Sequence, residues 1–327
     1  MNDVAKAAGV ALSTASRALA DNPRVSVTTR AQIQKLAREM GYVPSAIARG
    51  LATKRTYSLG VVVHDIIDPF QAELVRLIDM RALELGYSLL LSHSGDAEQR
   101  ERAAVNILRQ QRVDAIIMPD SSVSATFLSQ VTGEGIPVVL LNRMSYPYSI
   151  EIDNVGAGEM AANHLLDLGH RRIAYIGGTR TQTESDDRQS GYARALEKRG
   201  LTVDPSLITL GNGWSDGGRD CMREFLKLAY PPTAVFCFND LTAFGAIGAI
   251  QSAGLRVPED ISIVGFDDIA LAAILYPPLT SIAQDKEQMA KLAVDMANAL
   301  ATGKPAPQRT ILPGRLVVRA STCPVSS

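Results

Sequence analysis

The sequence predicts an α/β protein in which an all-α helix-turn-helix head precedes a core of two doubly wound, parallel-sheet lobes. Three observations support this fold class. Short helical patterns separated by turn residues fill positions 1–44. From Tyr57 onward, apolar strands alternate with helices, and the alternation restarts after Asp153-Asn154. With 327 residues, the chain is also too long for one ordinary core.

The composition is that of a globular protein, with 46% hydrophobic and 20% charged residues. No stretch approaches the roughly 18 consecutive apolar residues that a membrane span needs, and the N-terminus lacks the basic and then apolar layout of a secretory signal. The three cysteines, Cys221, Cys237 and Cys323, show neither metal-ligand spacing nor an even disulfide framework. We therefore expect a cytoplasmic protein with reduced thiols, no metal, no cofactor and no membrane contact.

Positive charge is concentrated at the N-terminus, although the whole chain has a net charge of −1. Residues 1–59 carry nine Lys or Arg and three acids, a net charge of +6, and the remainder carries −7. A basic segment joined to an acidic body is typical of a nucleic-acid-binding module attached to another domain. A merely solvated basic segment has the same composition, so charge alone does not decide.

The head is expected to contain three short helices. The first spans 3–8 and is closed by Gly9, and the second spans 12–19, with small or apolar residues along one face. The third follows Ser26, a suitable N-cap, and stops at Gly41. Two short helices around a Gly-Val turn, followed by a packing helix, predict a helix-turn-helix.

Residues 45–53, after Pro44, predict a further short, Ala-rich helix with Leu51 near its end. This helix is below the roughly 12–15 residues that an isolated helix needs, and it has too few apolar residues to fold alone. We expect it to be ordered only by a partner.

The rest of the chain alternates strands with helices. The expected strands are 59–63, 87–91, 115–118 and 137–141 in one half, and 172–176, 207–210, 233–237 and 261–265 in the other. The expected helices are 70–85, 98–111 and 125–133, then 161–168, 188–199, 216–226 and 243–253. Continuous apolar strands between helices indicate parallel sheets covered on both faces. Polar clusters follow several strand ends, where open α/β sheets bind ligands.

Several motifs along the chain carry more specific information. In the head they are Asp3-Val4-Ala5-Lys6-Ala7-Ala8-Gly9-Val10, Ser13-Thr14-Ala15-Ser16-Arg17-Ala18-Leu19 and Gly41-Tyr42-Val43-Pro44-Ser45-Ala46-Ile47-Ala48-Arg49-Gly50-Leu51. In the core they include Asp65-Ile66-Ile67-Asp68-Pro69-Phe70, Asp167-Leu168-Gly169-His170-Arg171-Arg172-Ile173, Asp260-Ile261-Ser262-Ile263-Val264-Gly265-Phe266-Asp267-Asp268 and Pro278-Leu279-Thr280-Ser281-Ile282. In this order, the motifs resemble those of the LacI/GalR family of transcriptional regulators over essentially the whole chain.

The resemblance implies a helix-turn-helix DNA-binding domain at 1–44, a hinge helix and linker at 45–56, and a periplasmic-binding-protein-like core at 57–327. It places an N-lobe at about 57–154 and 284–306, and a C-lobe at about 155–283 and 307–327. It also implies a repressor that binds palindromic double-stranded operator DNA under allosteric control by a small effector, a sugar or sugar derivative, held between the lobes. Only five residues, without heptads, follow Thr322, so we expect a homodimer.

By resemblance, nine residues are expected to contact DNA: Leu12, Ser13, Thr14, Ser16, Arg17, Arg24, Ser26, Ala48 and Leu51. Arg17 is expected to pair with a guanine through two hydrogen bonds, and Leu51 to wedge into a central base step. The alternative for Arg17 is a solvated surface arginine, and the alternative for Leu51 is a core leucine. Leu12 either contacts a thymine methyl or packs inward. The chain departs from the family at Ala11, where a Ser or Thr usually caps the recognition helix. The family also starts a few residues earlier, so either translation begins upstream or Met1 fills an apolar packing position.

Eight residues match effector-binding positions of the family: Asp68, Phe70, Arg143, Arg188, Trp214, Asn239, Asp267 and Gln284. Arg188 is expected to hydrogen-bond two ligand oxygens, and Trp214, the lone tryptophan, to stack on a ligand ring. Core packing is the alternative for Trp214. The alternative for Arg143 is an inter-lobe salt bridge, and the alternative for Asp68 is a helix cap. For Asp267 the alternative is a role in forming a turn.

Two other classes of protein share part of this pattern. A transport-type binding protein shares the two-lobed core, but the basic head and the lack of a secretory signal oppose it. A nucleotide-dependent enzyme is opposed because Gly177-Gly178 does not form a Gly-x-Gly-x-x-Gly fingerprint, and no Walker loop or His-Glu-x-x-His motif occurs. We expect no catalytic residues.

Overall fold

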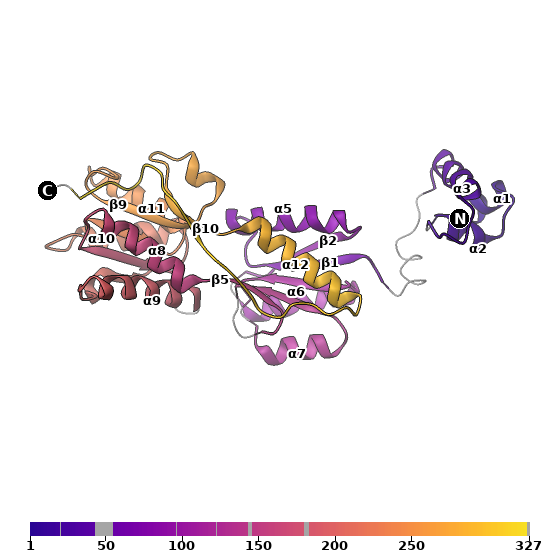
Figure 1. Cartoon of the computed structure of the whole chain (residues 1–327), viewed down its shortest axis with the longest axis horizontal. Coiled ribbons are helices and arrows are strands. Elements are labelled where there is room, and N and C mark those ends of the chain that lie inside the picture. Colours follow the sequence, from indigo (N-terminus) through magenta and orange to yellow (C-terminus); the bar gives the residue numbers. More distant parts are fainter. Residues whose placement is uncertain are drawn as a thin grey trace.

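A computed structural model describes residues 1–19, 21–42, 55–95, 97–121, 123–142, 146–179 and 183–325. Figure 1 shows the head and the two lobes of the core arranged along the long axis of the molecule. Within the described ranges, no helix has both the length and the apolar character needed to cross a membrane.

The head consists of the three predicted helices, α1 (Asn2–Ala7), α2 (Leu12–Leu19) and α3 (Val27–Glu39). Their inward faces, together with Val25 from the turn before α3, form one small apolar core of Val4, Ala5, Ala15, Ala18, Val25, Ile33 and Ala37. The hydroxyl of Ser26 accepts a hydrogen bond from the backbone N–H of Thr29 over 3.2 Å, so Ser26 is the N-cap of α3 as predicted. The predicted helix at 45–53 lies outside the described residues.

The N-lobe is a six-stranded parallel sheet between two layers of helices. Its strands lie in the order β11–β5–β4–β3–β1–β2. Their bounds are β1 Ser58–Val63, β2 Ser88–His93, β3 Ala115–Pro119, β4 Val138–Leu141, β5 Ser149–Ile152 and β11 Thr310–Leu312. Helices α5 (Pro69–Glu84) and α12 (Lys286–Ala301) pack on one face of the sheet, and α6 (Glu98–Gln110) and α7 (Ala125–Gly133) on the other.

The C-lobe repeats this design, with one antiparallel strand at the edge of its sheet. Its strands lie in the order β12–β10–β9–β8–β6–β7. Their bounds are β6 Ile173–Gly177, β7 Ile208–Leu210, β8 Ala234–Cys237, β9 Ser262–Asp267, β10 Thr280–Ala283 and β12 Arg315–Val317. Helices α8 (Asn154–Asp167) and α9 (Thr183–Lys198) cover one face, and α10 (Ser215–Leu226) and α11 (Asp240–Ser252) the other, with 3-10 turns η1 (Pro205–Leu207) and η2 (Ala270–Ala273). The predicted pair of doubly wound lobes is confirmed.

In the described part of the core, the chain crosses between the lobes three times: after β5, after β10 and between β11 and β12 (Figure 1). The first two crossings follow Ile152 and Ala283. The expected start of the last C-lobe segment at 307 is wrong, because residues 310–312 pair in parallel with β5 in the N-lobe sheet. A three-residue edge strand has too little pattern to reveal its partner from sequence.

Several other elements differ from the sequence prediction. The strands β5, β10, β11 and β12 and the helix α12 are not among the predicted elements, and α8 begins at Asn154 rather than near residue 161. Glycines in the first turns of α8 lower its helical propensity. The structure explains Gly158, because a Cβ there would lie 2.3 Å from the carbonyl oxygen of Arg188. Close contact between α8 and α9 therefore places Arg188 beside the start of α8.

Candidate functional sites in the head and between the lobes

The first turns of α2 present a polar surface to solvent. Ser13, Ser16 and Arg17 are exposed, and Thr14 is partly exposed, whereas Ala15 and Ala18 face the core of the head. Side chains on an exposed face of a second helix are free to enter a DNA groove. The structure therefore brings these predicted DNA-contacting residues onto one surface.

Leu12 lies on the same surface, with 48% of its area exposed, so the inward-packing alternative is excluded. Ala11 offers no side-chain acceptor, and its carbonyl oxygen accepts from the backbone N–H groups of Thr14 and Ala15. Arg24 and Ser26 are exposed beside α3, and Ser26 also serves as the N-cap described above. The predicted contacts of Ala48 and Leu51 lie outside the described residues.

A second group of polar side chains lies where the carboxyl ends of the parallel strands of both lobes meet. We call it the inter-lobe cluster and define it as Asp68, Asp120, Asn142, Arg188, Asp267 and Gln284. Asp120 and Asn142 directly follow β3 and β4 of the N-lobe, while Asp267 ends β9 and Gln284 follows β10 in the C-lobe. Strand carboxyl ends are where open α/β sheets bind ligands.

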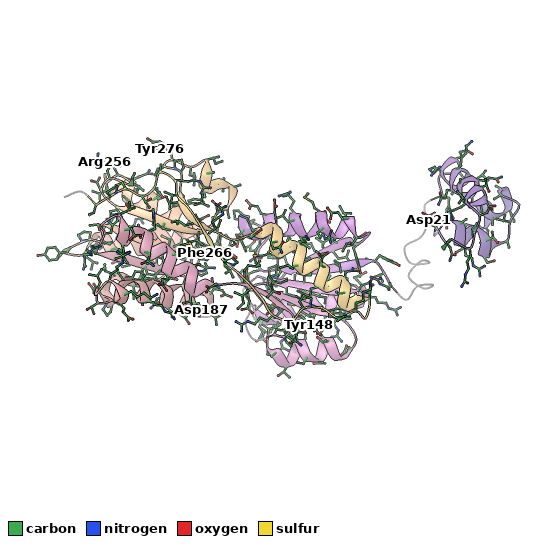
Figure 2. All side chains as sticks on the ribbon, in the orientation of Figure 1. Asp21, Tyr148, Asp187, Arg256, Phe266 and Tyr276 are labelled. Atoms are coloured by element: carbon green, nitrogen blue, oxygen red, sulfur yellow. The ribbon has the colours of Figure 1, made fainter. Side chains whose placement is uncertain are left out.

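Arg188 is the centre of the inter-lobe cluster and is 4% exposed. Its Nε donates to Oδ1 of Asn154 over 2.9 Å, and its Nη1 donates to the carbonyl oxygen of Phe238 over 2.6 Å. The guanidinium also lies over two aromatic rings, 3.5 Å from the centroid of Phe266 and 4.6 Å from that of Phe238. Figure 2 labels Phe266 at the end of the C-lobe that is turned toward the N-lobe. These contacts hold the charge in place but use only part of its hydrogen-bonding capacity.

Each lobe contributes one amide–carboxylate pair. In the N-lobe, Nδ2 of Asn142 donates to Oδ1 of Asp120 over 2.9 Å. In the C-lobe, Nε2 of Gln284 donates to Oδ1 of Asp267 over 2.7 Å. Because each amide nitrogen is turned toward a carboxylate, each amide oxygen is turned away, and the buried oxygens Oδ1 of Asn142 and Oε1 of Gln284 have no hydrogen-bond partner.

Burial raises the pKa of the carboxyl groups in and beside the cluster. The pKa of Asp68 rises to about 6, with the backbone N–H of Phe70 opposing the effect of burial. The pKa of Glu184 rises to about 7, chiefly by burial and then by repulsion from Asp120. Burial also raises the pKa of Asp120 and Asp267, and the positive charge of Arg188 opposes this in both. Because the charge of Arg188 in the C-lobe acts on the carboxyl group of Asp120 in the N-lobe, the two side chains belong to one electrostatic site.

The predicted effector residues that the structure describes lie in this cluster or beside it. Asp68 caps α5 by accepting from the backbone N–H of Phe70 over 2.9 Å, so the helix-cap alternative holds for it. Asp267 has a φ of +102°, as the turn alternative anticipated, and its side chain is nevertheless part of the cluster. Asn239 donates to the carbonyl oxygen of Gly213 over 2.9 Å, which places it beside the partly exposed Trp214. The predicted site at Arg143 lies outside the described residues.

Four residues of this region are not among the predicted site residues: Asp120, Asn142, Asn154 and Glu184. The first two carry a sequence signal, since each is the first polar residue after a buried apolar strand. Asn154 carries none, because its approach to Arg188 depends on how α8 and α9 pack. Glu184 lies one turn before Arg188 on α9, but the predicted helix starts at residue 188 and leaves Glu184 outside it. Among the residues that the structure describes, no group of three or more His, Cys, Asp and Glu side chains is arranged to hold a metal ion.

Asp240, behind the cluster, is fully buried and leads to a prediction about pH. It accepts from the hydroxyl of Ser281 over 2.6 Å and from the backbone N–H of Ile269 over 2.9 Å, yet burial raises its pKa to about 7. Between its unfolded pKa near 3.8 and its folded pKa, the folded state binds the extra proton, so stability falls as the pH rises. Each unit of pKa shift corresponds to about 1.4 kcal/mol.

We expect Asp240→Asn to flatten the decline in the free energy of unfolding between pH 4 and pH 7, measured by chemical denaturation. The matched control is Asp204→Asn. Asp204 is partly exposed, and hydrogen bonds from Ser206 and Arg172 lower its pKa, so its contribution is lost as the pH falls and has the opposite sign. An unchanged pH profile in Asp240→Asn would show that Asp240 is ionised in the folded protein.

Comparison with known protein families identifies both parts of the chain. Residues 1–45 match the family described as bacterial regulatory proteins, lacI family. Residues 162–322 match the periplasmic binding protein-like domain.

Individual relatives match over nearly the whole length. The chain is 37% identical to the HTH-type transcriptional regulator DegA of Bacillus subtilis (strain 168), over 99% of this chain and 98% of DegA. It is 34% identical to the ribose operon repressor of Escherichia coli (strain K12), over 90% of this chain and 91% of that repressor. A crystal structure of the lac repressor dimer, bound to operator and the anti-inducer ONPF, superposes with a TM-score of 0.88 and 29% identity, covering 98% of both chains.

Proposed function

The chain belongs to the LacI family of bacterial regulatory proteins, and on that premise we propose that it is a homodimeric transcriptional repressor controlled by a small polyhydroxyl effector. The head binds an operator, and the inter-lobe cluster binds the effector. We further propose the domain limits 1–44, 45–56 and 57–327, with the last crossing between β11 and β12. A cytoplasmic location and a role without catalysis complete the proposal.

The exposed face of α2 supports operator binding. Arg17 carries the fork of N–H donors that recognises guanine, and the neighbouring hydroxyls of Ser13 and Ser16 suit phosphate oxygens. The lac repressor of the superposed structure is a dimer bound to operator. Two copies of this head related by a twofold axis would read a palindromic site.

The observation that carries the effector proposal is the surplus of buried hydrogen-bond acceptors. Oδ1 of Asn142 and Oε1 of Gln284 have no partner, although these side chains are only 6% and 4% exposed. Leaving a buried acceptor unpaired costs roughly 1–3 kcal/mol. Hydroxyl groups of a sugar would supply donors to these oxygens and to the carboxylates, while accepting from the remaining N–H groups of Arg188. The amide oxygens come from different lobes, so one ligand bonded to both favours a defined lobe arrangement.

Trp214 and the acceptor surplus together suggest how a sugar is oriented. The indole is partly exposed near Asn239, and its face suits the apolar C–H groups of a pyranose or furanose ring. The hydroxyl edges of the ring would then be directed toward the carboxylates and amides. A change in the lobe arrangement couples effector and operator affinity by linkage.

One experiment tests both halves of the proposal. The purified full chain is incubated with random double-stranded DNA, and bound sequences are selected over several rounds. The selected DNA is then titrated in the presence of a panel of neutral sugars, while Trp214 emission is recorded. We expect a palindromic site whose affinity falls with salt, and at least one sugar that changes both operator affinity and emission.

The outcomes separate the two halves. Absence of any preferred DNA sequence would contradict the repressor assignment. A preferred site without any sugar response, combined with a response to an anionic metabolite that has no sugar hydroxyls, such as a dicarboxylic acid, would contradict the polyhydroxyl class but leave operator binding in place. A sugar that alters operator affinity without perturbing Trp214 emission would place the effector elsewhere.

A further inference from the structure

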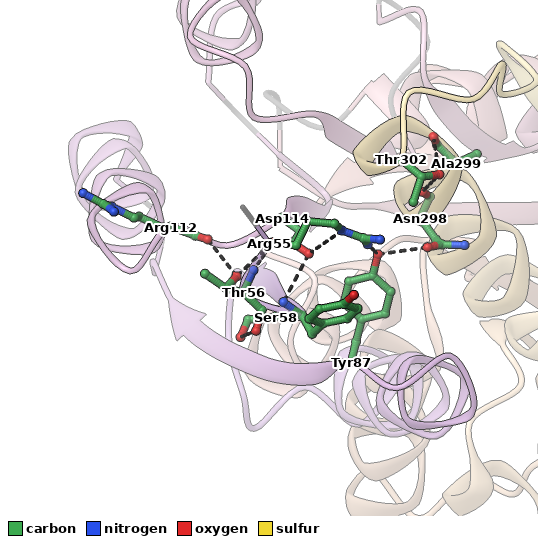
Figure 3. A network of polar contacts seen from close by, with 10 residues as sticks. Arg55, Thr56, Ser58, Tyr87, Arg112, Asp114, Asn298, Ala299 and Thr302 are labelled. Carbon is green, nitrogen blue, oxygen red and sulfur yellow. Dashed lines mark hydrogen bonds and ion pairs between the residues drawn. The ribbon is translucent and has the colours of Figure 1, made fainter. Parts of the chain in front are cut away.

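The chain enters the N-lobe through a segment held by one carboxylate. The side chain of Asp114, 6% exposed, accepts from the backbone N–H of Thr56 over 2.7 Å and from that of Tyr57 over 3.2 Å. It also accepts from the Thr56 hydroxyl over 2.9 Å and from Nε of Arg55 over 3.2 Å (Figure 3). We call Arg55, Thr56, Tyr57 and Asp114 the linker clamp. A buried carboxylate with this many charge-assisted bonds fixes the direction in which the chain enters the N-lobe.

The clamp also holds an unusual backbone conformation. Tyr57 has a φ of +53°, a left-handed conformation that an L residue with a large side chain rarely adopts. Such a conformation persists only where surrounding contacts impose it. The hydrogen bonds that Asp114 accepts from the N–H groups of Thr56 and Tyr57, on either side of the Thr56 Cα, supply those contacts, so loosening the clamp would let the segment relax.

Tyr87 joins the linker clamp to α12. The Arg55 guanidinium lies 4.9 Å from the ring centroid of Tyr57 and 5.5 Å from that of Tyr87, and its Nη2 donates to the Tyr87 hydroxyl. That hydroxyl in turn donates to Oδ1 of Asn298, in the last turns of α12, over 2.9 Å. Since Tyr87 is only 2% exposed, water does not readily replace either partner. Figure 3 shows this chain of contacts running from the clamp to α12.

The other end of α12 contacts the C-lobe. Lys286, its first residue, donates to the carbonyl oxygens of Asp268 over 2.8 Å and Asp267 over 3.2 Å. It also pairs with Glu73 of α5 over 2.7 Å, and Glu73 accepts from the backbone N–H of Ala270 over 2.9 Å. The first turn of α12 is therefore bonded to both lobes, next to Gln284 and Asp267 of the inter-lobe cluster.

Between these ends, α12 is a continuous, well-packed helix. It has 16 residues, which corresponds to about 24 Å at 1.5 Å per residue. Its inner face, including Met289, Ala293, Val294 and Ala297, is almost fully buried against α5 and the sheet. Closely packed helices shift as units rather than deforming gradually, so a displacement of one end reaches the other.

We propose that α12 transmits the arrangement of the lobes to the linker clamp, and that the hydrogen bond from Tyr87 to Asn298 is the contact through which it acts. The inference rests on the proposed function, because it names how the effector site controls the DNA-binding head. Tyr87 and Asn298 are positioning residues in this scheme and contact neither DNA nor effector.

Hydrogen exchange in the full chain, without DNA or effector, tests the transmission. The probes are the backbone amides of Thr56 and Tyr57, which exchange only when the linker clamp opens. Lys286→Met, which releases the first turn of α12 from the C-lobe, is expected to raise their exchange rate at least threefold. In a Tyr87→Phe background, which keeps the ring but removes the link to Asn298, adding Lys286→Met is expected to change the rate less than 1.5-fold.

The matched control is Thr302→Val. Thr302 donates to the carbonyl oxygens of Asn298 and Ala299 at the same end of α12 but does not contact the clamp, so the response to Lys286→Met should persist in its background. If Lys286→Met fails to fold, Glu73→Gln is the second variant, because it removes the negative charge that pairs with Lys286 and that accepts from the backbone N–H of Ala270 in the C-lobe. A merely structural role for the Tyr87 hydroxyl predicts the same fold-change in both backgrounds. That result, or no response to either Lys286→Met or Glu73→Gln, would overturn the proposal. Failure of operator selection would leave this measurement unaffected, so the two inferences fail separately.

Discussion

Arg188→Met is expected to lower the free energy of unfolding by about 3–5 kcal/mol, the usual cost of removing one partner from a buried ionic group. Methionine has a similar length but cannot donate to Asn154 Oδ1 or to the Phe238 carbonyl oxygen. The carboxyl groups of Asp120 and Asp267 would also lose the positive charge that opposes their desolvation. The same variant is expected to lose any effector response of Trp214 emission.

Chemical denaturation at pH 8 and pH 5 measures this effect and its origin. The loss should be smaller at pH 5, because groups whose pKa is raised, such as Glu184 with a pKa of about 7, are protonated there and need no counter-charge. Arg256→Met is the matched control, since Arg256 pairs with Asp260 at the exposed surface, where ion pairs contribute about 0–1 kcal/mol. If Arg188→Met lowers the free energy of unfolding by less than 1 kcal/mol, with no pH dependence, the carboxyl groups of Asp120, Asp267 and Glu184 are neutral even when the charge of Arg188 is absent.

Arg17→Met is expected to weaken operator binding by about 10–100-fold, which corresponds to the 1–3 kcal/mol of a two-bond contact between arginine and guanine. Arg17 is exposed on α2, so the substitution removes no packing from the core of the head. The measurement is a titration of the selected operator at fixed salt, because affinities for DNA have no meaning without the salt concentration.

Two further variants identify the kind of contact. Arg17→Lys keeps the charge but loses the planar fork, so it is expected to lose sequence preference while retaining non-specific affinity. Arg38→Met, on the exposed surface of α3, removes one charge away from α2 and should have a smaller effect. If Arg17→Lys bound with unchanged affinity and preference, Arg17 would contact only phosphate or solvent.

Much of the fold was predictable because its signals are local. The head helix Leu12–Leu19 and the N-lobe helix Ala125–Gly133 have the predicted bounds, since apolar spacing and flanking turn residues define such helices within a single turn. The apolar strands were placed within a few residues for the same reason. The predicted start of α8 is too late, because glycines in its first turns lower its helical propensity. One of them, Gly158, is required by a close contact with Arg188, a residue distant in sequence.

Much less of the inter-lobe cluster was predictable, because its members come from separate strand and helix ends. Resemblance to a family supplied Asp68, Arg188, Asp267 and Gln284, and all four belong to the region that the structure assembles. The contribution of Asn154 depends on the packing of α8 against α9, which no short-range pattern encodes. Glu184 precedes Arg188 by one turn of α9, a helix whose predicted start at residue 188 is too late. The roles of the nine predicted DNA-contacting and eight predicted effector-binding residues stay predictions until the variants are measured.

The sequence by itself determined the class of protein: a basic helix-turn-helix head, a two-lobed α/β core and family membership, all carried by local motifs, charge and apolar spacing. Only the tertiary structure decided that residues 310–312 belong to the N-lobe sheet and that α12 links the C-lobe to the linker clamp. It also decided which amide oxygens are left without partners. The physical reason is the same in each case. Strand pairing, helix crossing and hydrogen-bond satisfaction depend on atoms distant along the chain, whereas helix and strand formation depend mainly on neighbours.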